Sequence, residues 1–286
     1  MNKLNKELVK AKKRLVEIDK EKKSLEGEYK YLQNKIHLYF DSFLYDTSDA
    51  EEYIINHFWQ NATYSSDFYN SVLKQNYTKL QLSKITDKYC TKKKRALDVG
   101  CGNGMYTEHL ATIFSECVGL DMSVPRIKRN TKNNKLENVT YLAENFIFCD
   151  TEKLGKYDLI FAADLGMYSH KKYHKSTFKA LLRLLNDDGV LVTRESTTMK
   201  GSRDYKSSNY VAYYRNRKYY KKGIYKKHCI KSFRDCSYNI KTLDKYFCVF
   251  PKDKEKVDKN PALLDKIVKN YVSKNIGSNH YYIYKR

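Results

Sequence analysis

The chain of 286 residues has no hydrophobic run long enough to cross a lipid bilayer, and its charged N-terminus lacks the apolar core of a secretory signal. The seven cysteines are scattered, odd in number and contain no Cys-x-x-Cys pair, which argues against a disulfide framework. His228, Cys229, Cys236 and Cys248 are near one another, but their spacing fits no common zinc site. These absences predict a cytoplasmic protein with reduced thiols, no membrane span and no metal.

Acidic residues are also in short supply. Lysine and arginine together number 55 against 33 aspartates and glutamates, which gives a formal net charge of +22. Such an excess suggests a nucleic-acid partner. Arginine, the residue suited to bidentate phosphate contacts, is nevertheless scarce, while asparagine and tyrosine are abundant, as an AT-rich genome would produce without selection for binding. A polyanion-binding surface therefore stays an alternative rather than the main interpretation.

Residues 1–40 carry a heptad pattern. The apolar positions, spaced by alternate steps of four and three with one lysine interrupting, are Leu4, Leu8, Ala11, Leu15, Ile18, Leu25, Tyr29, Leu32 and Ile36. A repeat of about five heptads predicts a coiled-coil helix. In a parallel homodimer, Glu7 would face Lys12 and Arg14 would face Asp19, which attract, whereas Glu21 would face Glu26, which repel. The balance mildly favours parallel pairing. The main prediction is a homodimer through this helix; packing on its own domain or docking on another protein are the alternatives.

Residues 41–92 are predicted to form a helical connector. One helical face is predicted to carry Ile54, Ile55, Phe58 and Trp59, and residues 68–82 show similar spacing. Trp59 is expected to be a core anchor. Segments that precede a cofactor domain often fold over its cleft, so a lid is the alternative role for this connector.

From Lys94 onward, short apolar runs alternate with amphipathic segments. The predicted strands span 96–99, 117–120, 139–142, 157–164, 190–193 and 280–284, and the predicted helices span 105–113, 124–134 and 178–185. Continuous apolar runs are typical of strands that are buried on both faces, as in a parallel sheet covered by helices. We therefore expect residues 93–286 to form a doubly wound, Rossmann-like α/β domain with a mostly parallel sheet.

The first predicted strand leads directly into three alternate glycines, Gly100, Gly102 and Gly104, and the second strand ends at Asp121. Strand, glycine loop, helix, strand and acid are the frame of a nucleotide-type cofactor site. A dinucleotide fingerprint has its third glycine one residue later. Asp98, two residues before the first glycine, would repel a pyrophosphate but suits the ammonium group of S-adenosylmethionine (SAM). The spacing therefore favours SAM.

These segments resemble the class I SAM-dependent methyltransferases. The matching stretches are 97–104 (Leu-Asp-Val-Gly-Cys-Gly-Asn-Gly), 119–123, 145–146, 157–164 and 184–192. They follow one another in the family's order and spacing over about residues 93–195. The resemblance implies a seven-stranded sheet and methyl transfer from SAM. It says almost nothing about the acceptor, because this fold serves many acceptors.

The resemblance also implies contacts to the methionine and ribose parts of the cofactor. Gly100, Gly102 and Gly104 would line the methionine part. Asp98 would orient their loop and help to hold the ammonium group, and Asp121 would accept hydrogen bonds from both ribose hydroxyls.

At the adenine ring, the resemblance implies packing by Met122 and Phe146. Asn145 stands where the family commonly has an aspartate beside the adenine amine, and its side-chain oxygen can still accept a hydrogen bond. Asp164, or the backbone beside it, would face the methionine end and the acceptor.

The segment after the fourth strand bears on the reaction. Relatives that methylate amino groups carry paired prolines and an aromatic residue after this strand. Here Asp-Leu-Gly-Met-Tyr stands at 164–168 instead. This difference disfavours the exocyclic amines of DNA bases as the methyl acceptor. A base is needed only if the acceptor must lose a proton. His170 is the first candidate for that base, although a helix-capping role is the alternative. Tyr168 and Glu195 are the other candidate catalytic residues.

The region after the fifth strand is expected to bind the acceptor. Its candidate substrate-binding residues are Arg194, Arg203, Tyr210, Tyr214 and Arg215. Three of the few arginines in the chain lie in this region, which favours an acceptor that carries a phosphate or carboxylate. The tyrosines interleaved with lysines as far as Lys227 could instead stack on unpaired bases, or belong to a tyrosine-rich helical pair that packs on the sheet.

The main prediction is a cytoplasmic methyltransferase that acts at an oxygen atom of a small or carrier-linked acceptor. A coiled coil joined to a methyltransferase loosely resembles bacterial enzymes that modify surface polysaccharides, so a sugar or sugar-linked phosphate is the expected acceptor. The alternatives are an RNA methyltransferase that uses the basic surface and a cofactor-binding scaffold without catalysis.

The heptad pattern makes a direct prediction about mass in solution. We expect the full chain to sediment as a dimer and a chain lacking residues 1–40 to sediment as a monomer, because the apolar seam would be buried only between two helices. Analytical ultracentrifugation or mass photometry measures both. Monomers in both cases would contradict the dimer.

Overall fold

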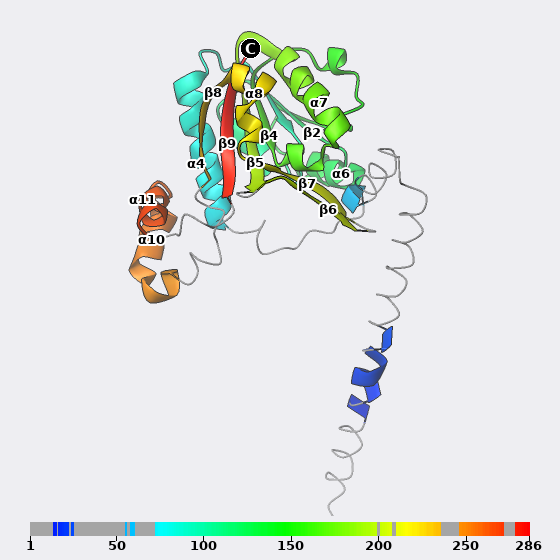
Figure 1. Cartoon of the computed structure of the whole chain (residues 1–286). Coiled ribbons are helices and arrows are strands. Elements are labelled where there is room, and N and C mark those ends of the chain that lie inside the picture. Colours follow the sequence, from blue (N-terminus) through cyan, green and yellow to red (C-terminus); the bar gives the residue numbers. More distant parts are fainter. Residues whose placement is uncertain are drawn as a thin grey trace, which may run out of the picture.

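The computed structural model describes residues 14–15, 17–22, 24–25, 55, 58–60, 72–198, 201–207, 210–235, 246–271 and 278–286 (Figure 1). The described residues between 14 and 25 are helical and exposed. Most of the predicted coiled coil, and of the connector before residue 72, lies outside the described residues. Within the described part, no helix has the length and apolar character that a membrane span requires, and no cluster of histidine, cysteine or acidic residues is arranged to hold a metal ion.

A mixed, mostly parallel sheet forms the centre of the domain. Its core strands lie side by side in the order β3 (Val139–Ala143), β2 (Glu116–Asp121), β1 (Arg95–Val99), β4 (Tyr157–Ala163), β5 (Leu185–Thr198), β9 (Ser278–Lys285) and β8 (Cys229–Arg234). The first five are parallel, and β9 runs antiparallel to both of its neighbours. The order and directions confirm the predicted α/β fold with its mostly parallel sheet.

Helices cover both faces of this sheet. Successive residues of a strand point to opposite sides, so an apolar strand presents a hydrophobic surface on each face for helices to pack against. Leu159 and Phe161 of β4 belong to one buried cluster, and Ile160 and Ala162 belong to the other. The first cluster includes residues of α4 (Val72–Tyr89), α5 (Met105–Ala111), α6 (Val124–Asn133), α10 (Pro251–Lys259) and α11 (Leu263–Tyr271), and the second includes residues of α7 (Lys171–Arg183) and α8 (Gly223–His228). Figure 1 shows α4 and α7 on opposite sides of the sheet.

The region after β5 differs from one sequence-based expectation. The prediction of a tyrosine-rich helical pair is wrong: β6 (Arg203–Ser207) and β7 (Tyr210–Asn216) form an antiparallel hairpin, which is followed by a 3-10 turn at Tyr219–Lys221 and the short helix α8. In β7, Tyr213 and Arg215 are buried whereas Tyr214 and Asn216 are half-buried, which is the two-residue period of a strand. The hairpin extends the sheet where Thr197 of β5 pairs with Arg215.

Two elements have boundaries that differ from those predicted from the sequence. The helix predicted at 178–185 is α7, which begins at Lys171 because the His170 side chain caps its first turn by accepting a hydrogen bond from the Lys172 backbone N–H. The polar turn at 186–189 lies within β5, where the register with β4 shifts between Tyr157 and Leu159.

The sheet brings the polar residues at its carboxyl edge together. Val99 pairs with Leu120 and with Ala162, and Ala163 pairs with Arg194. The residues that follow β1, β2, β3 and β4 therefore emerge at one edge. In open α/β sheets this edge is where ligands bind.

Candidate active site

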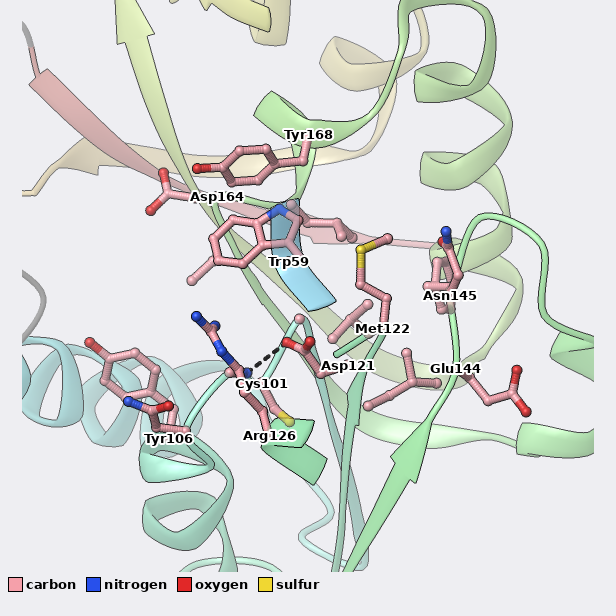
Figure 2. A pocket seen from close by; sticks show the side chains of 18 of the residues that line it. Trp59, Cys101, Tyr106, Asp121, Met122, Arg126, Glu144, Asn145, Asp164 and Tyr168 are labelled. Carbon is pink, nitrogen blue, oxygen red and sulfur yellow. Dashed lines mark hydrogen bonds between the residues drawn. The ribbon is translucent and has the colours of Figure 1, made fainter. Parts of the chain in front are cut away.

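A cleft of about 210 Å³ opens at the carboxyl edge of the sheet (Figure 2). Most of the predicted cofactor residues line it: Gly100, Gly102, Asp121, Met122, Asn145, Phe146 and Asp164. Figure 2 shows Asp164 and Tyr106 toward one side of the cleft and Met122, Asn145 and Glu144 toward the other, with Asp121 and Trp59 between them. The cleft therefore has two ends, which differ in their chemistry.

The glycine loop forms the floor at the middle of the cleft. The backbone N–H groups of Gly100 and Cys101 both donate to the Leu120 carbonyl, at 2.7 and 3.1 Å. One carboxylate oxygen of Asp121 accepts a hydrogen bond from the Gly102 N–H, and the other accepts one from the Ser123 N–H, each at 2.8 Å. Asp121 thus ties the loop to the start of α6.

Asp98 and Gly104 lie behind this loop rather than on the cleft wall. Asp98 is buried and accepts a hydrogen bond from the Thr107 hydroxyl at 2.8 Å. Burial raises the pKa of Asp98 to about 7, and the bond from Thr107 opposes the rise. Gly104 begins α5 with a φ of 78°, and a Cβ there would lie 2.9 Å from Cζ of Tyr141. Both residues shape the loop from below.

The side of the cleft at β3 is apolar with polar edges. Phe146 is buried, and Met122 is half-buried. The Asn145 side-chain oxygen accepts a hydrogen bond from the Ile147 N–H at 3.1 Å, which uses one of its two acceptor positions. Glu144 also lines this side, and its backbone N–H donates to the Asp121 carbonyl at 3.1 Å.

The opposite end of the cleft holds a buried ion pair between strands β4 and β5. Nη2 of Arg194 lies 2.9 Å from Oδ2 of Asp164. The other carboxylate oxygen accepts hydrogen bonds from the backbone N–H and the hydroxyl of Ser196, at 2.9 and 2.7 Å. Burial alone would raise the pKa of Asp164, but Arg194, Lys74 and Ser196 together hold it below its usual value. Asp164 is therefore ionised.

Arg194 has further partners on the same wall. Its guanidinium donates to the Thr78 hydroxyl at 3.3 Å and lies 3.9 Å from Oδ2 of Asp235. Burial works against its charge, yet Asp164 and other neighbours raise the pKa of Arg194 well above the usual value. Lys74 lines this wall too, and burial together with Arg194 lowers its pKa to about 7, against the opposing effects of Asp164 and Asp235.

The turn after β4, Leu165–Tyr168, is held from beneath. Arg215 donates to the backbone carbonyls of Gly166 and Ser169, the latter at 2.7 Å. Glu195, the residue next to Arg194, points to the other face of the sheet and accepts a hydrogen bond from the Gly166 backbone. It lines a separate cavity of about 20 Å³ beneath the turn. Arg215 and Glu195 therefore fix the turn that carries Tyr168.

Trp59 lies across the cleft from outside the sheet. Its ring meets the Tyr168 ring edge-on at 4.8 Å, and the Arg126 guanidinium lies 5.0 Å from its centroid. The neighbouring Gln60 donates to the Met122 carbonyl at 2.5 Å and accepts a hydrogen bond from the Val124 N–H. The segment containing Trp59 thus contacts both ends of the cleft.

The structure does not gather the remaining predicted catalytic and substrate residues in this cleft. Tyr168 and Arg194 line it, whereas His170 caps α7 and Glu195 and Arg215 support the turn from below. Arg203 lies over the ring of Tyr214, 5.4 Å from its centroid, on the β6–β7 hairpin. Only the backbone of Tyr210 is described.

Several cleft residues were not predicted as such. Glu144 directly follows the third strand, at the edge where ligands bind, so its position was accessible from the sequence. Lys74 and Arg126 carry no comparable signal. They lie on helices whose approach to the cleft depends on tertiary packing.

The fold and the cleft define a class I SAM-dependent methyltransferase. A family model described as a methyltransferase domain matches residues 69–234, which is more than half of the chain, so the chain belongs to this family. It is accordingly a SAM-dependent methyltransferase, with SAM as its cofactor. No curated protein matches the chain in sequence.

Solved structures are similar in fold. A SAM-dependent methyltransferase from Leishmania major has a TM-score of 0.56 and 12% identity, over 82% of this chain and 83% of that one. Coclaurine N-methyltransferase bound to N-methylheliamine and SAH has a TM-score of 0.51 and 14% identity, over 91% and 87%. DhpI in complex with SAH has a TM-score of 0.50 and 10% identity, over 83% and 97%. At such low identity, the likeness shows the fold alone.

The buried Glu195 carboxyl predicts a pH-dependent stability. Burial raises its pKa from 4.5 to about 8, with Asp164 adding to the rise and Arg215 opposing it. Between these values the folded chain keeps a proton that the unfolded chain releases, so stability falls as the pH rises toward 8. Asp98 adds to that fall below about pH 7, and Lys74, whose pKa is lowered, opposes it above about pH 7. We therefore expect the melting temperature of the native chain, relative to that of Glu195→Gln, to fall from about pH 6 to about pH 8.5, because glutamine does not titrate.

Differential scanning fluorimetry across this pH series measures the effect. Glu137→Gln on the exposed surface is the control and should leave the slope unchanged. Equal slopes for the native chain and Glu195→Gln would be inconsistent with a protonated buried carboxyl.

Proposed function

We propose that the cleft binds SAM with its ribose at Asp121, its adenine at the Met122 and Phe146 side, and its methionine part toward the glycine loop and Asp164. The observation that carries this assignment is the Asp121 carboxylate, which emerges at the end of β2 on the cleft wall while holding the Gly102 N–H. A carboxylate is a suitable acceptor for two ribose hydroxyls. The half-buried Met122 and buried Phe146 offer an apolar surface for the adenine ring.

The reaction we propose is methylation at an oxygen atom of a small or carrier-linked acceptor, such as a sugar or sugar-linked phosphate of surface polysaccharide synthesis. SAM supplies a methyl group on a positively charged sulfur. The protein has to align the acceptor with that methyl group and exclude water. At the Asp164 end, Trp59 and Tyr168 offer aromatic cover and Arg194 offers positive charge. This combination suits an acceptor that carries hydroxyl groups or an anionic group.

The part of the 41–92 connector around Trp59 is proposed to act as a lid. Trp59 covers the cleft from outside the sheet, and Gln60 bonds to the backbone on either side of Ser123. We expect these contacts to break when the segment opens to admit the acceptor.

A homodimer through the N-terminal helix remains part of this proposal. Within the described residues, Leu15, Ile18 and Leu25 of the heptad seam are exposed, at 63%, 44% and 65%. An apolar seam at heptad spacing would be buried by a second copy of the same helix.

The cofactor assignment predicts that Asp121→Asn weakens SAM binding by at least about tenfold, because an amide keeps one acceptor oxygen and adds donors where the ribose hydroxyls donate. Isothermal titration calorimetry with SAM measures the loss. The matched control is Asp187→Asn, since Asp187 is fully exposed beside Arg286 at the opposite edge of the sheet. Native affinity in Asp121→Asn would contradict the assignment.

The acceptor assignment predicts where a methyl label goes. With SAM that carries a tritiated methyl group, we expect label in the sugar fraction of a panel of sugar phosphates and nucleotide sugars, and none in short RNA. Thin-layer chromatography separates the products. Label confined to the RNA would contradict the sugar proposal and favour the basic surface as the substrate site.

A further inference from the structure

Lys74 is a cleft residue that the proposed reaction does not yet use. It lies in the first turn of α4, its side chain is only 2% exposed, and it lines the cleft. Thr78, four residues later, accepts hydrogen bonds from Arg194 at 3.3 Å and from the Tyr281 hydroxyl at 3.2 Å. Residues four apart share one face of a helix. The face of α4 that bonds to Arg194 therefore also carries Lys74, which fixes the amine at the Asp164 end of the cleft.

The environment of Lys74 favours the uncharged amine. Burial is the main reason that its pKa falls to about 7, and the Arg194 guanidinium lowers it further, while Asp164 and Asp235 oppose the fall. Lys84, on the same helix, is exposed to water instead. Such a lowered pKa leaves a larger share of the Lys74 amine unprotonated near neutral pH, and an unprotonated lysine nitrogen can act as a nucleophile.

We propose that Nζ of Lys74 is itself a methyl acceptor, so that the enzyme methylates its own cleft when no other acceptor occupies it. The inference rests on the proposed cofactor orientation. With the ribose at Asp121 and the methionine part toward Asp164, the reactive methyl group faces the wall that Lys74 and Arg194 form. The amine is already desolvated there and held by the helix, so little reorganisation precedes the attack.

The step balances with SAM as the only co-reactant. The lone pair of Nζ forms the new nitrogen–carbon bond, and the carbon–sulfur bond breaks with its electron pair remaining on sulfur. The sulfonium becomes the neutral thioether of S-adenosylhomocysteine. The nitrogen then carries one methyl group and a positive charge, and it returns to the uncharged secondary amine by releasing a proton to solvent.

The test uses the full chain and SAM with a deuterated methyl group, without any added acceptor. Peptide mass spectrometry should find one labelled methyl group on Lys74. Lys74→Arg should lose the label, whereas Lys84→Arg on the exposed face of α4 should keep it. Calorimetry with SAM on each chain verifies that the cleft is intact, and Lys74→Met provides a second variant if the arginine disturbs the packing.

A mixing experiment tests whether the transfer occurs within one cleft. An Asp121→Asn chain, which keeps Lys74, is mixed with a Lys74→Arg chain that calorimetry shows to bind SAM. The SAM concentration is one at which the Asp121→Asn chain alone stays unlabelled, and we expect it to stay unlabelled in the mixture. Labelling in that mixture would overturn the transfer within one cleft, as would label spread evenly over surface lysines. SAM binding with an unlabelled Lys74 would overturn this inference alone. Absence of SAM binding would overturn the proposed cofactor site together with it.

Discussion

A buried ion pair between Asp164 and Arg194 is the contact on which one end of the cleft, the proposed acceptor end, depends. It joins the end of β4 to β5, and the same two side chains bond Ser196 and Thr78 and approach Asp235. Removing one member of such a pair would leave a buried charge uncompensated, at a cost of about 3–5 kcal/mol. The pair therefore fixes both the direction in which the chain leaves β4 and the position of α4 over the cleft.

Two carboxylates in the cleft, Asp121 and Asp164, have different partners and different roles. The carboxylate oxygens of Asp121, in the middle of the cleft, accept hydrogen bonds from the backbone N–H groups of Gly102 in the glycine loop and of Ser123 at the start of α6. Asp164 is neutralised by Arg194, so the Asp164 end has a balanced set of buried charges into which Lys74 brings an amine of low pKa. In the proposed orientation, the methyl group of SAM would face the Arg194 guanidinium and the rings of Trp59 and Tyr168.

Local patterns in the sequence were sufficient to predict the positions of the residues proposed to bind the cofactor. The glycine loop, the strand-ending Asp121 and the buried apolar strands are each set by neighbours a few residues away, and the structure has them where their spacing predicts. The residues at the proposed acceptor end were harder to predict from the sequence, because Trp59 and Lys74 reach the cleft only through tertiary packing. The two-residue period of a strand could have predicted that Arg194 and Glu195 lie on opposite faces of the sheet, because neighbouring residues in β5 point to opposite faces.

The central claim is the orientation of SAM in the cleft, and a crystal structure of the full chain with S-adenosylhomocysteine tests it most directly. The account predicts electron density for the ribose hydroxyls within hydrogen-bonding distance of the Asp121 carboxylate, the adenine ring beside Phe146, and the sulfur on the side of Asp164 and Lys74. Adenine at the Asp164 end, or the ligand bound outside this cleft, would contradict the account.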